Sequence, residues 1–144
     1  MNYKDSEADS RQLEQRLSQQ IQALYLTCLG HQPNQVSCRI IDQVLTIVVN
    51  NPITSMERFL VARGKQQLAE QVRTSIHKAF QPELKALIEE VLRVSVTDLL
   101  GSSSLETGRT SVTAVLAAKP EVGNLSFRIK VAPQKISDSD LDNA

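Results

Sequence analysis

The chain has 144 residues, of which 41% are hydrophobic and 22% are charged, a composition that suits one globular domain with a single core. Sixteen basic residues balance sixteen acidic ones, which excludes a global positive field able to hold nucleic acid. The longest apolar run, 44–49, is far shorter than the roughly 20 residues of a membrane-spanning helix. The first residues lack the order of a secretory signal, so we expect a cytoplasmic protein.

Apolar periodicity places a helix and a hairpin in the first third of the chain. Spacings of three and four predict an amphipathic helix that begins near Ser10 and ends at Gly30, a usual residue just past a helix. Residues 36–40 alternate between apolar and polar, and residues 44–49 are largely β-branched. Separated by a polar turn, these two segments predict a β-hairpin.

The middle of the chain predicts consecutive helices. Thr54 and Glu57 fit a capping box, in which each side chain binds the other's backbone N–H, so a helix should start there and pause at Gly64. Pro82 predicts a kink or the first turn of a further helix. Between them, a stripe at a spacing of four predicts a helix face against the core, made of Leu68, Val72, Ile76 and Phe80.

A second hairpin is predicted from residues 94–100 and 109–118, joined by a small polar loop over 101–108. The whole order predicts an α+β fold: an N-terminal helix, a β-hairpin, two to three helices and a β-hairpin, with a four-stranded, mainly antiparallel sheet packed by helices. The strands carry more apolar positions than one buried sheet face requires. We therefore expect a homodimer.

The predicted domain organisation has three parts. Residues 1–9 form a frayed N-terminus, residues 10–119 form the single α+β domain, and residues 120–144 form a C-terminal extension. Within the extension, apolar and polar residues alternate over 124–131, which predicts an edge strand or an arm that pairs with another subunit. The acidic tail that follows is expected to be disordered.

The sequence predicts no catalytic, cofactor or metal site. His31 and His77 have no companion ligands at zinc spacings, and we expect Cys28 and Cys38 to be buried structural thiols rather than a disulfide. Neither a nucleophile elbow nor a phosphate-binding loop is present. The most polar loop could still hold a ligand, and its candidate residues are Ser102, Ser103, Ser104 and Arg109.

A basic bias on the central helices is the strongest local charge feature. It could meet an acidic protein, the acidic tail of a neighbouring subunit, anionic lipid headgroups or nucleic acid. Nucleic acid is disfavoured because no aromatic residues are interleaved with the cations. The residues of this predicted interaction surface are Arg58, Arg63, Lys65, Arg73 and Lys78.

Three segments carry a resemblance to a known family: 53–60, which opens a helix, 80–84 at the predicted bend, and 88–91 after it. Over about residues 10–118 the chain resembles the bacterial MpsC-like proteins, long known only as a domain of unknown function. The resemblance implies a component of a Na+-translocating, membrane-potential-generating system, and it supplies no agreed catalytic residues.

These observations predict a non-enzymatic cytosolic interaction or regulatory module. The resemblance implies that it acts as a peripheral component beside a protein partner at a membrane-associated ion-translocating system. The alternative is a small-ligand-binding domain or small enzyme, with a pocket near the loop from Ser102 to Arg109. An ordered pocket with convergent polar groups would favour that alternative.

Overall fold

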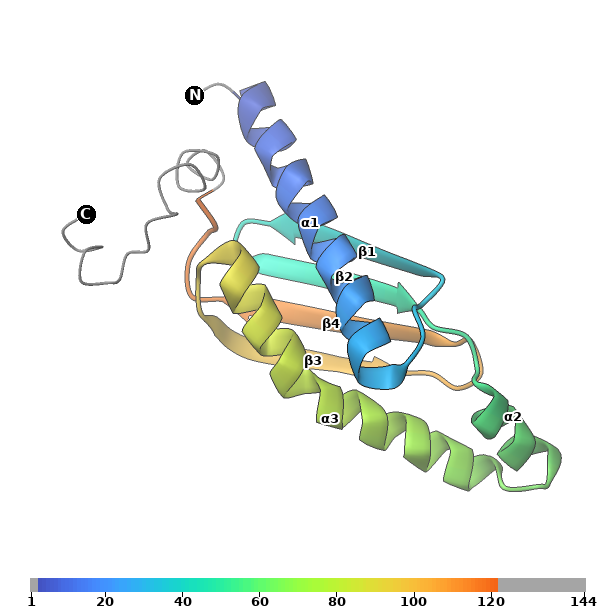
Figure 1. Ribbon diagram of the computed structural model, residues 1–144. Coiled ribbons are helices and arrows are strands. Elements are labelled where there is room, and N and C mark those ends of the chain that lie inside the picture. The colour runs from blue at the N-terminus through green and yellow to red at the C-terminus, as the bar shows by residue number, and fades with distance from the viewer. Residues whose placement is uncertain (1–2, 122–144) are drawn as a thin grey trace.

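The computed structural model describes residues 3–121, and in that range the chain forms three helices and one four-stranded sheet (Figure 1). The sheet is antiparallel throughout, with the strand order β1-β2-β4-β3. The predicted α+β architecture is confirmed. The predicted strand over 124–131 lies outside the described residues. The strands are β1 (Gln35–Ile41), β2 (Val44–Asn50), β3 (Val96–Ser103) and β4 (Arg109–Leu116).

Strict alternation divides the sheet into a covered and an open face. Cys38, Ile47 and Val112 are neighbours across three strands and are all buried. The helices α1 (Tyr3–Leu29) and α3 (Gln66–Leu92) cross this face (Figure 1) and contribute fully buried residues to the core, including Leu17, Ile21 and Ile88. The core is therefore one layer between two helices and one side of the sheet.

The opposite face of the sheet is not covered by any described element. It carries exposed apolar side chains among polar ones, at Ile41, Val44, Val48 and Leu100. Val44 lies opposite Val115 on β4, so apolar groups continue across the strands on this side. The excess of apolar strand positions noted in the sequence is thus real and lies on the open face.

Two glutamates tie the long helices to the outer strands. Glu14 of α1 accepts a hydrogen bond from the backbone N–H of Ile40 on β1 at 2.8 Å. Glu89 of α3 accepts one from the backbone N–H of Val96 on β3, also at 2.8 Å. Because β1 and β3 are the edges of the sheet, these carboxylates satisfy edge donors that no strand pairs.

The short helix α2 (Ser55–Ala62) begins with the predicted capping box. The Thr54 hydroxyl accepts from the Glu57 backbone N–H at 3.1 Å, and the Glu57 carboxylate accepts from the Thr54 backbone N–H at 2.8 Å. The predicted pause at Gly64 is confirmed, since that residue has a φ of +75° between α2 and α3. Positive φ costs glycine little, so the chain can reverse there.

Two predicted details of the helices are wrong, whereas the kink predicted as one alternative at Pro82 is observed. The first helix begins at Tyr3 rather than near Ser10. Pro82 lies inside a single helix, α3, whose axis changes direction about midway in Figure 1, so the kink rather than a new helix is observed. Leu68 and Ile76 of the predicted core stripe are 44% and 41% exposed, because the first half of α3 extends beyond the sheet, where α2 and the neighbouring loops cover only part of its surface.

The predicted loop over 101–108 is also too long. Gly101, Ser102 and Ser103 belong to β3, so the connection to β4 consists of residues 104–108. Gly101 fits this strand because its backbone closely approaches β4: a Cβ atom there would overlap the backbone oxygen of Ser111 and lie 3.0 Å from the Cα atom of Val112.

Replacement of Gly101 by alanine should therefore force β3 and β4 apart. We expect Gly101→Ala to lower the free energy of unfolding by about 1–3 kcal/mol, the usual cost of overpacking, in urea denaturation followed by circular dichroism. Ser102→Ala on the same strand is the control and should change it by less than about 0.5 kcal/mol. Equal stability of the two variants would contradict this account of Gly101.

Candidate functional site

A buried ion pair lies where α2, α3 and two loops meet. Nε of Arg73 donates to Oε2 of Glu57 at 3.3 Å, and the two side chains are only 5% and 4% exposed. The other carboxylate oxygen of Glu57 caps α2 through Thr54. A single buried carboxylate therefore joins the start of α2 to the side of α3.

Arg73 also binds three backbone carbonyls. Its NH2 group donates to the oxygens of Asn51, at 2.5 Å, and Pro52, at 3.5 Å, and its NH1 group donates to the oxygen of Ser104 at 3.3 Å. The guanidinium thus fixes the loop before α2 and the loop after β3 against α3. The planar guanidinium carries several donors in a fixed arrangement, so it can bind several acceptors at once. A lysine ammonium could not reach all of them.

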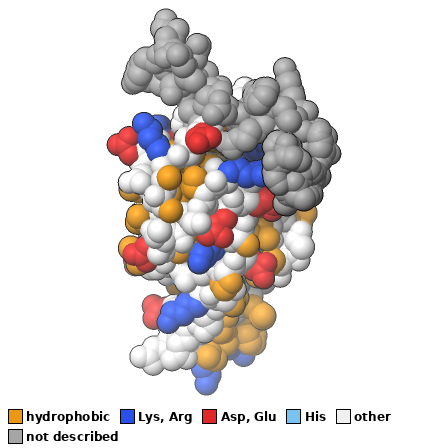
Figure 2. Space-filling model, turned by 90° about the vertical axis from the view of Figure 1, so that its left-hand side faces the viewer, with side chains coloured by type: hydrophobic (Ala, Val, Ile, Leu, Met, Phe, Trp, Pro, Cys, Tyr) orange, Lys and Arg blue, Asp and Glu red, His pale blue; other side chains and the backbone are white. Residues whose placement is uncertain are grey.

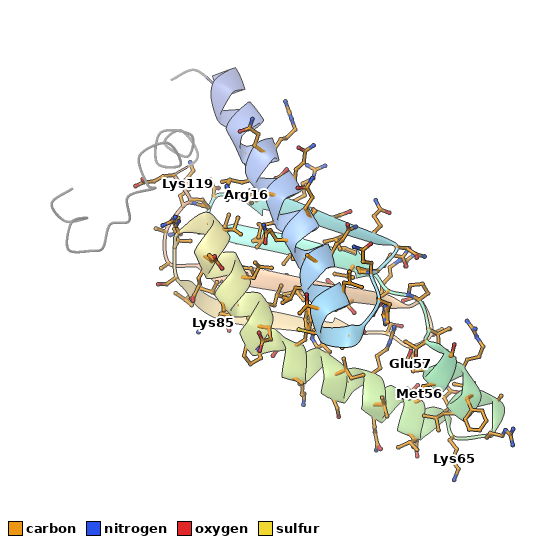
Figure 3. All side chains as sticks on the ribbon, in the orientation of Figure 1. Arg16, Met56, Glu57, Lys65, Lys85 and Lys119 are labelled. Carbon is orange, nitrogen blue, oxygen red and sulfur yellow. The ribbon has the colours of Figure 1, made fainter. Side chains whose placement is uncertain are left out.

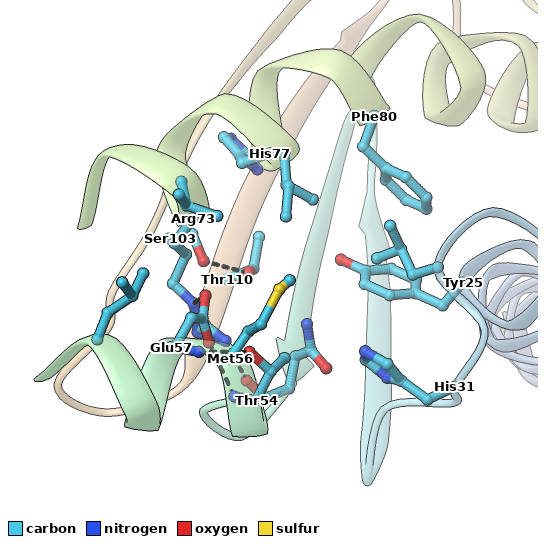
Figure 4. A pocket seen from close by; sticks show the side chains of 15 residues that line it. Tyr25, His31, Thr54, Met56, Glu57, Arg73, His77, Phe80, Ser103 and Thr110 are labelled. Atoms are coloured by element: carbon cyan, nitrogen blue, oxygen red, sulfur yellow. Dashed lines mark hydrogen bonds and ion pairs between the residues drawn. The ribbon is translucent and has the colours of Figure 1, made fainter. Parts of the chain in front are cut away.

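A pocket of about 340 Å³ opens beside this ion pair (Figure 4). Its walls come from the end of α1, the loop before α2, helices α2 and α3, and the adjoining ends of β3 and β4. Most of the lining is apolar, as in many small-molecule sites. The apolar lining residues are Leu29, Met56, Leu60, Val72, Ile76 and Phe80.

Tyr25 and His77 bring polar groups to the same pocket. Burial raises the pKa of Tyr25 to about 12, an effect that the charge of Arg73 and a hydrogen bond with Thr110 partly offset. Burial also lowers the pKa of His77, so its imidazole is neutral at pH 7. The Tyr25 hydroxyl points into the pocket in Figure 4, while its ring packs against Phe80 with centroids 4.4 Å apart.

The ligand loop predicted from the sequence is divided by the structure. Ser103 lines the pocket, where its hydroxyl lies 2.7 Å from that of Thr110. Ser104 contributes its carbonyl to Arg73, whereas Ser102 and Arg109 are exposed and do not line the pocket. Sequence reasoning missed Tyr25, Asn51 and Thr110, because no motif connects residues so far apart in the chain.

The predicted basic surface is likewise divided. Arg73 was wrongly placed on it, because the structure buries this side chain against Glu57. Lys78 is exposed on α3. Arg58, Arg63 and Lys65 are exposed on the segment 55–65, which we call the tip.

The tip also exposes large apolar side chains. Met56 is 69% exposed and Phe59 is 57% exposed, and the guanidinium of Arg63 lies 4.7 Å from the centroid of the Phe59 ring. In Figure 2, hydrophobic side chains gather beside Lys and Arg at the lower end of the molecule, the end formed by α2 and the start of α3 in Figure 1. The tip therefore combines apolar and basic groups.

The two candidate histidines, His31 and His77, both line the pocket, whereas neither cysteine does. Within residues 3–121, no group of three or more His, Cys, Asp or Glu side chains could hold a metal ion. Both cysteines are free; Cys28 is exposed, against our prediction, whereas Cys38 is buried. Burial raises the pKa of Cys38 to about 11, and a hydrogen bond with Ser18 partly offsets this rise.

The ion pair predicts a specific energetic coupling. Arg73→Met should cost about 3–5 kcal/mol, because it leaves the Glu57 carboxylate buried without its partner charge. In Glu57→Gln/Arg73→Met the remaining amide can still cap Thr54 without a buried charge, so the double variant should lose less than the summed single losses by about 0.5–3 kcal/mol. Chemical denaturation measures the free energy of unfolding of Glu57→Gln, of Arg73→Met and of the double variant.

Lys78→Met is the matched control, since it removes an exposed cation from the same helix. Its stability should differ from wild type by less than about 0.5 kcal/mol. Strict additivity of the two ion-pair substitutions would contradict a direct interaction between Glu57 and Arg73.

Comparison with known proteins gives one family. The sequence model of the Na+-translocating membrane potential-generating system (MpsC) matches residues 9–118, and no curated protein and no solved structure matches the chain. None of the helices described between residues 3 and 121 has the length and apolar character to cross a bilayer. The resemblance carried by segments 53–60, 80–84 and 88–91 is confirmed, and the chain belongs to the MpsC family.

Proposed function

We propose that this protein is a non-enzymatic cytoplasmic module that attaches peripherally to a membrane-associated ion-translocating system through its tip. The observation that carries this proposal is the unbalanced charge of the tip. Its only carboxylate, Glu57, is turned inward to Arg73, whereas Arg58, Arg63 and Lys65 remain exposed. The family's link to a membrane system supports a partner of this kind.

An anionic bilayer surface has the chemistry that the tip fits. Each Lys or Arg near such a surface contributes about 1 kcal/mol, so three cations give a weak, reversible attachment. Met56 and Phe59 add apolar area on the same segment, which can enter the boundary between headgroups and acyl chains. Neither contribution anchors a protein alone, and together they favour a peripheral role.

The tip predicts charge-dependent binding to vesicles. Full-length protein should sediment with vesicles of phosphatidylglycerol and phosphatidylcholine, and Arg58→Gln/Arg63→Gln/Lys65→Gln should weaken binding by on the order of tenfold or more. The control Arg11→Gln/Arg16→Gln/Lys85→Gln removes the same charge from exposed positions; Arg16 and Lys85 lie far from Lys65 in Figure 3. Equal binding of the two triple variants would refute docking through the tip.

A vesicle experiment also separates lipid from protein as the docking surface. One outcome is that wild-type protein fails to bind anionic vesicles and still sediments with native membranes. If protease treatment of those membranes abolishes the binding, the tip binds an acidic protein instead of lipid. The triple variant at the tip should then lose that interaction, and the control should keep it.

The open face of the sheet supports a second proposal, that the module is a homodimer. Two copies meeting through Ile41, Val44, Val48 and Leu100 would cover exposed apolar area that no described element of one subunit covers. In a two-fold dimer the same residues of both copies would meet across the axis.

Light scattering on a sizing column tests the dimer. We expect a dimeric mass for the full chain and a monomeric mass for Val44→Lys/Val48→Lys, because four buried ammonium groups would oppose association. Thr74→Lys, on the exposed side of α3, should remain dimeric. A monomeric wild-type protein would refute the proposal.

A further inference from the structure

One polar atom in the pocket wall has no partner. The side-chain oxygen of Asn51 is buried and accepts no hydrogen bond from the described residues. The backbone of Asn51 is held on both sides, since its N–H donates to the oxygen of Gly108 at 2.7 Å and its carbonyl accepts from Arg73. Buried acceptors are normally hydrogen-bonded, so we expect a bound molecule to supply the donor for this oxygen.

The pocket offers no permanent free charge to a ligand. Its one guanidinium and its one carboxylate, those of Arg73 and Glu57, bind each other, and its other ionisable side chains are the imidazoles of His31 and His77 and the phenol of Tyr25. A charged ligand would lose its hydration here without gaining a counter-charge, which strongly disfavours it. The pocket therefore selects for uncharged molecules.

The pocket has the size and the walls of a small-molecule site. Its volume of about 340 Å³ lies within the range of roughly 300–1,000 Å³ that is typical of ligand pockets. Its walls include Leu60, Val72, Ile76 and Phe80, which give water no hydrogen bonds. An apolar body fits this space, with a polar group at the end where Asn51 lies.

We propose that the pocket binds a small uncharged molecule that has an aromatic or aliphatic body and a hydroxyl or N–H donor directed at the side-chain oxygen of Asn51. The apolar body lies between α2 and α3, and the Tyr25 hydroxyl and the pair formed by Ser103 and Thr110 face the same space. This binding goes beyond attachment through the tip and does not require it.

Two related fluorescent probes test the selection for neutral ligands. N-phenyl-1-naphthylamine is an uncharged aromatic amine with one N–H donor, and 8-anilinonaphthalene-1-sulfonate adds a sulfonate to the same skeleton. In fluorescence titrations of the full chain we expect saturable binding of the neutral probe and at least about tenfold weaker binding of the sulfonate to the pocket. Absence of saturable binding by the neutral probe would overturn the proposal.

Three variants test whether the neutral probe binds in the pocket. Asn51→Leu keeps the backbone bonds and removes the acceptor, so it should weaken neutral-probe binding by about fivefold to tenfold without lowering the melting temperature of the free protein. Val72→Trp should fill the pocket and abolish binding. Ala79→Trp, which adds the same ring at an exposed position of α3, should bind as wild type does.

The outcomes distinguish ligand binding in the pocket from attachment through the tip. Unchanged binding by both Asn51→Leu and Val72→Trp would show that the probe lies elsewhere and would overturn the assignment. The tip variant with three glutamines should bind the neutral probe with wild-type affinity, because none of its substituted residues lines the pocket. Loss of probe binding in that variant would likewise contradict a site in the pocket.

Discussion

The carboxylate of Glu57 is the point on which the arrangement of α2, α3 and their flanking loops depends. One oxygen caps α2 and the other binds Arg73, which in turn holds the carbonyls of Asn51, Pro52 and Ser104. A helix of eight residues is not stable alone in water. Because a buried ion pair loses in desolvation much of what it gains in attraction, its main effect here is to specify where α2 lies.

That inward-turned carboxylate also decides the charge of the outer surface. The sequence of the tip contains one acid among three bases, which would be a mixed surface if all four were exposed. Burial of Glu57 removes the acid from the surface and leaves its cations beside Met56 and Phe59. The same interaction therefore orders the tip and makes it basic.

The fold was predictable where the deciding interactions are local. The capping box of Thr54 and Glu57 and the turn at Gly64 depend on neighbouring residues, and both hairpins follow from alternation within short segments. The exposure of Leu68 and Ile76 was not predictable, because it depends on how far α3 extends past the sheet. Periodicity reports which residues share a helix face and not what covers that face.

Most residues of the candidate site could not be predicted from the sequence, for the same reason. Arg73 is sixteen positions from Glu57 and shares α3 with other basic residues such as Lys78, so its charge looked like part of a solvated face. Gly101 to Ser103 looked like loop because glycine and serine are uncommon in strands, yet the close approach of β4 requires the glycine. Contacts between distant segments decided both positions.

Helix α2 brings the tip and the pocket into one structural unit. Leu60 lines the pocket, Phe59 beside it is exposed on the tip, and Met56 does both. A residue change that displaces α2 must therefore alter the pocket wall and the exposed surface of the tip together, whereas exchange of the exposed cations alters only that surface.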